Sequence, residues 1–309
     1  MAAYQRPTIG RRILGKKLQK AREAAGLSVE QVSRAAGQSE AATYRQESGA
    51  TAVKETAIPF FANQYGIDDP EEIDRLKAWC KIAKIKGTWG PSGTQLGPTF
   101  NDYADAESFS SELRFCELLA VPGLLQTEEY STAIIRRAAT VHPGELPSES
   151  TLAEIEEKVR MREARKALLK RDDPKPPRIW AVLGEAAVRT PPRTDDGGRA
   201  HKEQIQHLLN LGEGIATIQV LPLAAGLHSA TSGSFSVMTI GDVELIHREG
   251  YAADGSFIDS EAQVRDYRAR YERLQVQALN IERSRKFLHD LLARGIACSR
   301  SVRFAGLVM

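Results

Sequence analysis

The chain has 309 residues, of which 42% are apolar, and its formal net charge is +2. This length and apolar content allow substantial cores and predict two domains, one small and one larger. No uninterrupted run of about 18 apolar residues occurs, and no apolar stretch with a cleavage site follows the N-terminus, which excludes membrane-spanning and secreted classes. We therefore expect a soluble, cytoplasmic protein without a membrane partner.

The three cysteines, Cys80, Cys116 and Cys298, are far apart and form no CxxC pair. An odd number of scattered cysteines is typical of reduced thiols in a cytosol. We interpret all three as ordinary free thiols.

Charge is distributed unevenly along the chain. Residues 1–66 contain ten Lys or Arg and five Asp or Glu, an excess of five positive charges, so the remainder carries an excess of three negative charges. The N-terminal segment is therefore the part that we expect to meet a polyanion.

Short helices separated by glycines are predicted within this basic segment. Ser28, with Gln31 three residues on, forms a capping box for one helix, and Gly37 ends that helix. Ser39 caps the next helix, over residues 40–47. Helices of two to three turns are marginal alone, so these helices must pack against one another.

A helix, a tight turn with glycine and a second short helix form a helix-turn-helix, whose second helix presents side chains to the DNA major groove. The pattern LGKKLQKAREAAGLS…AAGQS…YRQESG resembles the Xre-type, Cro/repressor-like DNA-binding domain over residues 9–66. The resemblance implies that Glu47 contacts the first helix through Arg22. We predict contact with double-stranded DNA by Arg11, Arg12, Lys16, Gln38, Ser39, Glu40, Ala41, Tyr44, Arg45 and Lys54.

Within this set, the resemblance places Glu40, Ala41 and Tyr44 at base edges and Arg45 at a phosphate or a neighbouring acid. Glu40 has two interpretations that stay open: it accepts a hydrogen bond from cytosine N4, or it is a helix N-terminal charge favoured by the macrodipole.

Three positions depart from the family pattern. Thr43 and Gln46 stand where the family usually has aliphatic core residues, and Tyr44 replaces a small serine. These departures predict looser packing under the third helix.

The rest of the small domain predicts two further helices. Pro59 predicts a kink in the first of them, and Asp69 with Pro70 predicts the capped start of the second. The segment GTWGPSGTQLGPTF, rich in Gly and Pro, is typical of a linker. We therefore predict an all-α helix-turn-helix domain of about five helices over residues 1–86 and a linker over residues 87–99.

Residues 100–294 predict a larger α+β domain, followed by a C-terminal tail over residues 295–309. The strands RIWAVL and ATIQVLPL flank a helix and form a βαβ unit with parallel strands. The strands SFSVMTI and VELIHR flank Gly241-Asp242, a two-residue hairpin turn. Together these segments predict a mixed sheet of at least four strands.

Helix boundaries are also predicted in the larger domain. Thr127 should cap one helix, and Thr151 with Glu154 should form a capping box for the next. The chain closes with an amphipathic seam that fits either a core helix or a coiled-coil dimer contact. The seam consists of Val264, Tyr267, Tyr271, Leu274, Ala278 and Ile281.

The larger domain also resembles a known family. The ordered segments VPGLLQTEEY, VRMREARKALLKR, WAVLGEAAVR, QIQHLLNLGE and QVLPLAAGLHSATSGSFSVM are similar to the domain that follows the DNA-binding module in WhiJ-like regulators of actinomycetes. The resemblance implies an antitoxin-like regulator with a small partner protein encoded nearby. Gly184 stands where this family often has Asp.

No catalytic or metal site is predicted. The six histidines form no HExxH motif or ligand cluster, and no G-x-S-x-G elbow occurs. His228 and Ser229 are adjacent on a loop, which does not make them a base and nucleophile pair. We expect no cofactor and no enzymatic activity.

An effector site is predicted at the loop over residues 224–234, because loops after parallel strands tend to bind ligands. The predicted effector or partner-binding residues are Trp180, His228, Ser229, Ser232 and Phe235. Trp180 and Phe235 also fit a plain core role. A small protein is the favoured occupant and a small molecule is the alternative.

The sequence predicts a homodimeric, sequence-specific transcription regulator whose larger domain dimerises and senses that occupant. The alternative is an antitoxin-like protein that sequesters a small partner and binds DNA for autoregulation. An enzyme fused to a DNA-binding domain has no motif to support it.

Overall fold

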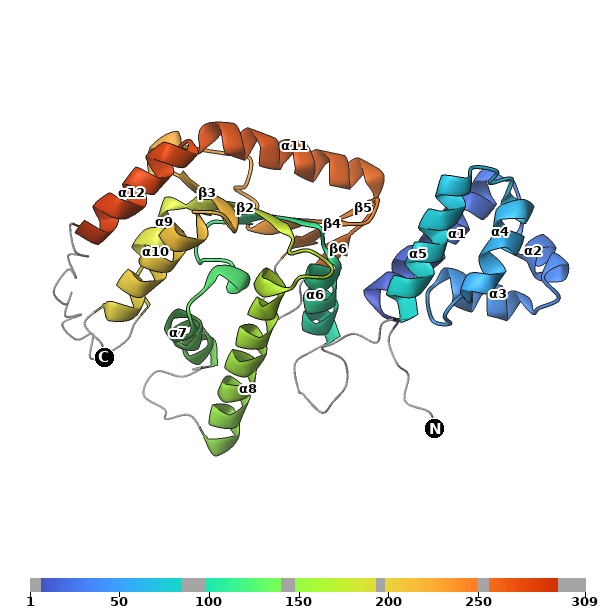
Figure 1. Ribbon diagram of the computed structural model, residues 1–309, viewed down its shortest axis with the longest axis horizontal. Helices are drawn as coiled ribbons and strands as arrows, with labels where there is room; N and C mark the ends of the chain where they lie inside the picture. Colours follow the sequence, from blue (N-terminus) through green and yellow to red (C-terminus); the bar gives the residue numbers. More distant parts are fainter. Residues whose placement is uncertain (1–6, 85–97, 140–147, 193–197, 249–255, 294–309) are drawn as a thin grey trace, which may run out of the picture. The chain divides into compact units, whose positions relative to one another are not determined.

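The structure is a computed structural model that describes residues 7–84, 98–139, 148–192, 198–248 and 256–293. The chain divides into two compact units, Met1–Phe109 and Ser110–Met309, whose elements are labelled in Figure 1. The predicted tail lies outside the described residues. The predicted linker does too, except for its last two positions, which begin a helix.

The first unit is entirely helical where it is described. Its elements are α1 (Ile9–Ala24), α2 (Val29–Ala35), α3 (Glu40–Glu47), the 3₁₀ turn η1 (Glu55–Ala57), α4 (Ile58–Tyr65), α5 (Pro70–Lys84) and α6 (Pro98–Phe109). Helices α1 to α5 confirm the predicted all-α domain. The kink predicted at Pro59 is wrong, because η1 ends at Ala57 and Pro59 falls in the first turn of α4. A first-turn proline leaves no intrahelical hydrogen bond unmade.

The second unit contains a mixed sheet, as predicted. Its six described strands are β1 (Glu112–Glu117), β2 (Arg178–Gly184), β3 (Ala216–Leu221), β4 (Phe235–Ile240), β5 (Val243–Arg248) and β6 (Ser256–Ile258). They lie in the order β3-β2-β1-β4-β5-β6. Strand β2 pairs in parallel with both β1 and β3, and the remaining pairs, β1–β4, β4–β5 and β5–β6, are antiparallel. Strands β1 and β6 were not predicted from the sequence.

Helices cover both faces of this sheet. They are α7 (Glu128–Ala139), α8 (Glu149–Arg165), α9 (Glu185–Arg189), α10 (Arg199–Leu211), α11 (Glu261–Gln277) and α12 (Ile281–Ala293), with 3₁₀ turns η2 (Gly123–Leu125), η3 (Lys166–Lys170) and η4 (Leu223–Ala225). Figure 1 shows α11 along one face and α7, α8 and α10 on the other.

One of the two predicted helix caps in this unit is wrong. The backbone N–H of Tyr130 donates to Thr127 Oγ1 at 3.3 Å, as expected of a cap. Helix α8, however, begins three residues earlier than predicted, because Ser148 Oγ accepts from the backbone N–H of Thr151 at 3.2 Å. Thr151 is therefore inside the helix.

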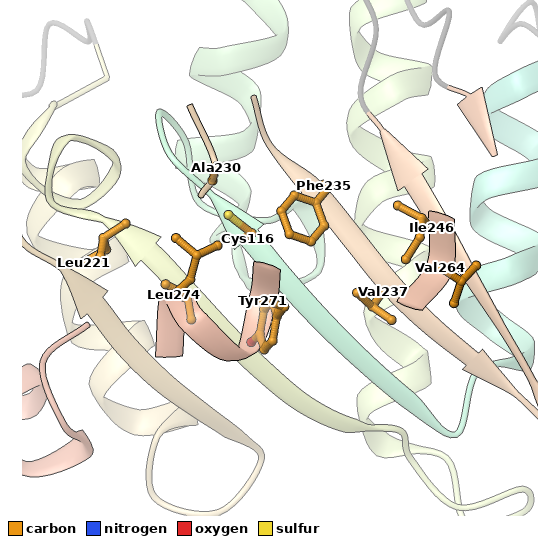
Figure 2. Packing of buried hydrophobic residues seen from close by; sticks show 10 residues of the cluster. Cys116, Leu221, Ala230, Phe235, Val237, Ile246, Val264, Tyr271 and Leu274 are labelled. Atoms are coloured by element: carbon orange, nitrogen blue, oxygen red, sulfur yellow. The ribbon is translucent and has the colours of Figure 1, made fainter. Parts of the chain in front are cut away.

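The closing seam belongs to the core. Figure 2 shows Tyr271 and Leu274 of α11 packed among Cys116, Val237 and neighbouring apolar side chains of the sheet. The Tyr271 hydroxyl donates to the Trp180 carbonyl oxygen at 3.1 Å. The seam is therefore not free to form a coiled coil.

Candidate nucleic-acid interface

Helices α2 and α3 begin at the caps that the sequence predicted. The Ser28 backbone N–H donates to the Gln31 side chain at 2.8 Å, and the Gln31 N–H donates to Ser28 Oγ at 3.2 Å. Ser39 Oγ accepts from the Ala42 N–H at 3.3 Å. Gly37 has a φ of +62°, in the left-handed region that glycine tolerates. Local chemistry therefore sets where α3 begins.

Helix α1 crosses the end of α3 at a glycine. A Cβ atom on Gly15 would lie 2.6 Å from the carbonyl oxygen of Gln46 and closer still to that of Glu47. Gly49, with a φ of +77°, lies against the backbone of Arg11, where a Cβ atom would come within 2.8 Å. Only glycine permits both approaches without a shift of the backbone.

A buried ion pair joins the same two helices. Arg22 Nε lies 2.6 Å from Glu47 Oε1, and Arg22 Nη2 lies 3.0 Å from Glu47 Oε2. Arg22 also donates to the Leu27 carbonyl oxygen at 2.8 Å. The hydrogen bond to Glu47 raises the pKa of Arg22. This pair is the contact implied by the resemblance, and it fixes the orientation of α3 on α1.

The underside of α3 is polar and hydrogen-bonded. The hydroxyls of Ser33 and Thr43 lie 2.7 Å apart, and both are buried. The Gln38 amide donates to Thr43 Oγ1 and to Gln46 Oε1, each at 2.9 Å. Thr43 and Gln46, which depart from the family pattern, are thus paired through Gln38. These two hydrogen bonds hold the half-buried Gln38 side chain against α3.

The outer face of α3 carries the residues predicted to read bases. Glu40, Ala41, Tyr44 and Arg45 are all exposed, and Tyr44 keeps 58% of its surface accessible. A rigid helix with exposed polar and aromatic side chains can contact base edges in a major groove.

The other cations predicted to contact DNA lie outside α3. Arg11 is half-buried and donates to the Ala83 carbonyl oxygen at 3.4 Å, and Lys16 is half-buried on α1. Arg12 forms an ion pair of 3.4 Å with Asp102 of α6. Lys54 is exposed, just before η1. The structure thus places these cations on α1 and after α3, beside the recognition face and not on it.

The predicted effector loop lies at the carboxyl edge of β1, β2 and β3. The Leu118 N–H donates to Ser234 Oγ at 3.2 Å, and the Leu223 N–H donates to Glu185 Oε2 at 2.8 Å. Gly184 packs so closely on Leu118 that a Cβ atom would lie 2.6 Å from the Leu118 carbonyl oxygen. The departure at Gly184 is therefore explained by close packing, and the three loops are tied together.

Of the predicted effector residues, two hold the loop in shape. His228 Nδ1 accepts from the Ala230 N–H at 3.2 Å, and Ser229 Oγ donates to the Arg270 carbonyl oxygen at 3.0 Å. These bonds point the two side chains to different partners, which is not the geometry of a nucleophile and base. Ser232 is exposed on the same loop.

Trp180 and Phe235 take the core role that was one of their two predicted interpretations. Phe235 is 2% exposed, and its ring centroid lies 5.0 Å from that of Tyr267. Trp180 is half-buried and packs against the same cluster. Phe235 therefore does not offer an exposed wall at this edge.

Three exposed leucines at this edge were not predicted from the sequence. Leu119, Leu223 and Leu227 are 78%, 72% and 91% exposed. Leu119 follows Leu118, which packs against Gly184, and the next residue, Glu185, is hydrogen-bonded to Leu223. Leucines exposed to this extent in neighbouring loops form a surface that can receive an apolar partner.

Two family models match the chain, one for each part of it. A model described as a helix-turn-helix domain matches residues 13–76, and a model described as a domain of unknown function, DUF5753, matches residues 100–290. The chain belongs to the DUF5753 family. Comparison with curated proteins and with solved structures found no match.

The helix-turn-helix match covers the α1–α3 crossing described above, so this geometry belongs to a DNA-binding module of the kind found in transcription regulators. The DUF5753 match begins inside α6 and ends inside α12. Within the described ranges, no group of three or more His, Cys, Asp or Glu side chains is placed to hold a metal ion. None of the described helices combines the length and apolar character needed to cross a membrane.

Proposed function

We propose that this protein is a sequence-specific transcription regulator of Xre type that binds double-stranded DNA through α3 and catalyses no reaction. The observation that carries the proposal is the construction of α3. Ser39 caps the helix, the pair of Arg22 and Glu47 locks it to α1, and its exposed face includes Tyr44. A short helix that is capped, bound to its neighbour by an ion pair and exposed on its outer face is suited to entry into a major groove. Such a regulator acts in the cytoplasm.

The proposal assigns the DUF5753 domain a sensing and dimerising role. The ordered segments that resemble WhiJ-like regulators of actinomycetes support this role, and so do the exposed loops at the carboxyl edge of the parallel strands. A small protein is the favoured occupant of that edge.

Substitution of Tyr44 tests base reading by α3. An operator selected from a random pool and a mixed-sequence duplex are titrated at several salt concentrations. Tyr44→Ala is expected to lower the ratio of specific to non-specific affinity about tenfold, because it removes an aromatic contact to base edges. Lys54→Ala is the matched control and should weaken binding to both duplexes alike, with the salt slope reduced by about 1. Equal affinity of the wild-type protein for both duplexes at every salt concentration would exclude sequence-specific binding.

A second candidate function is an antitoxin-like role, in which the protein sequesters a small cognate partner and binds DNA for autoregulation. The exposed Leu119, Leu223 and Leu227 favour it, because leucines this exposed at one edge of the sheet offer apolar surface to a protein partner. Co-purification with the small protein encoded nearby separates the two functions. A tight stoichiometric complex that Leu227→Ser dissolves would favour sequestration, and a weak complex that changes operator affinity would favour sensing.

A further inference from the structure

Helix α6 belongs to one part of the protein by sequence and to the other by contact. The DUF5753 match begins at residue 100, so it includes most of α6. The compact unit that contains the helix-turn-helix, however, extends to Phe109 and includes the whole of α6. Helix α6 is therefore the element of the DUF5753 match that packs within the DNA-binding unit.

The charges of α6 and α1 are complementary. Helix α6 contains three acidic residues and no basic residue, whereas α1 contains six basic residues and one acidic residue. Asp102 Oδ2 lies 3.4 Å from Arg12 Nη1, with 15% of the aspartate side chain and 42% of the arginine side chain exposed. A carboxylate at this position offers Arg12 the same anionic oxygen chemistry as a DNA phosphate.

We propose that α6 is an autoinhibitory element, in which Asp102 occupies Arg12 and competes with a DNA phosphate for it. This inference rests on the proposed DNA-binding function and adds a regulatory contact to it. The competition is between two partners of one cation, so any event that withdraws α6 raises the affinity for DNA of any sequence. Withdrawal of α6 changes no base contact, because Arg12 lies on α1, whereas the side chains proposed to contact bases lie on α3.

The chain connects α6 directly to the centre of the sheet. Only Ser110 and Ser111 separate α6 from β1, and the Ser111 N–H already donates to the Thr239 carbonyl oxygen at 2.8 Å. At its other end β1 leads to Leu118, whose N–H is bonded to Ser234 of the proposed partner loop. A partner that bound this loop would thus act on the strand that continues into α6.

The test uses the full chain and a mixed-sequence duplex of about 30 base pairs, with affinity measured by fluorescence anisotropy across a salt series. Asp102→Asn is expected to raise the affinity about fivefold, in line with the modest strength of a partly exposed ion pair. The slope of log affinity against log salt should steepen by about 1, because Arg12 becomes available to one more phosphate. Asp102→Glu keeps the charge and should bind like the wild type.

Two controls separate competition from a general gain of positive charge. Asp74→Asn makes the same charge change at an exposed carboxylate of α5 that pairs with Lys77 at 2.9 Å, and it should change the affinity less than twofold. Asp102→Asn should have no effect in an Arg12→Gln background. Thermal unfolding of each variant checks that it is folded, and Asp102→Ser replaces Asp102→Asn if the latter is not.

An unchanged affinity for Asp102→Asn, while the wild type binds, would overturn the autoinhibitory contact and leave the proposed function standing. An equal gain in the Arg12→Gln background, or with Asp74→Asn, would also overturn it. If neither the wild type nor any variant bound a duplex, the proposed function would fall, and this inference with it.

Discussion

Arg22 and Glu47 are charged residues in the interior of the first unit, where they are 7% and 8% exposed. A buried ion pair contributes little compared with apolar residues of the same size, but the loss of one partner leaves an uncompensated buried charge. The pair also lies near Tyr65, whose pKa is raised to about 12, mainly by burial. The orientation of α3 therefore depends on both charges being present.

Glu47→Gln is expected to lower the free energy of unfolding by about 3 kcal/mol, because it strands the Arg22 charge. Glu30→Gln is the matched control, since Glu30 pairs with Arg34 at 2.7 Å but both side chains are more than half exposed. Loss of this surface pair should cost less than about 1 kcal/mol. Urea denaturation monitored by circular dichroism measures both. Equal losses in the two variants would contradict the role given to the buried pair.

Some site residues could be predicted from the sequence because their interactions are local. Ser39 caps the helix that begins at the next residue, so its role follows from its neighbours in the sequence. The role of Phe235 could not be derived in this way. A strand residue is buried or exposed according to which face is covered, and α11, which covers Phe235, begins at Glu261. Leu227 was missed for a related reason, since no pattern shows that a loop leucine stays exposed.

At the scale of the helices, the fit of α3 on α1 depends on the absence of a side chain at Gly15. Glycine inside a helix normally costs about 0.5–1 kcal/mol relative to alanine. The close approach of the α3 carbonyl groups gives a reason for glycine here. An added methyl group would have to displace backbone atoms, which cannot rotate away as a side chain does.

Gly15→Ala should therefore destabilise the protein by about 2 kcal/mol or more, against the usual direction for a helical glycine. Gly26→Ala serves as a control, because Gly26 has a φ of +70° but no atom within 4 Å of an added Cβ. Its cost should be limited to about 1 kcal/mol of left-handed backbone strain. The measurement is the unfolding midpoint of each variant in urea. A more stable Gly15→Ala protein would show that the two helices can separate without cost.

Most elements were predictable, and the failures have physical causes. The βαβ unit and the hairpin have apolar strands bounded by turn signals. Strand β1 lacks that signature, since three of the six residues in its sequence ELRFCE are charged, and Arg114 bonds to Glu112 at 2.6 Å within the strand. The helical spacing of apolar residues in the seam continues past Gln277, where α11 ends. The Leu279 N–H instead donates to the Val220 carbonyl oxygen of β3 at 2.8 Å, a contact that no local pattern contains.

For the whole molecule, a single small helix-turn-helix domain reads few base pairs, so specific binding usually requires two. The apolar seam of α11 was one surface predicted for such pairing. Because Val264, Tyr271 and Leu274 are buried in the core of the second unit, that seam cannot serve as the contact between copies. A homodimer, as proposed here, must therefore use surface outside the seam.

We expect a homodimer at micromolar concentration that binds a two-fold symmetric operator, with half-site centres about 34 Å apart, one turn of the duplex. Sedimentation equilibrium gives the mass of the free protein and of its operator complex. Insertion of about five base pairs between the half-sites should abolish the tight binding, because it moves one half-site to the opposite face of the duplex. The substitution Tyr271→Phe, which removes only a hydroxyl within the core, should leave the mass unchanged. A monomeric protein whose molecules bind the two half-sites independently, with an affinity that does not depend on the half-site spacing, would rule out the dimer.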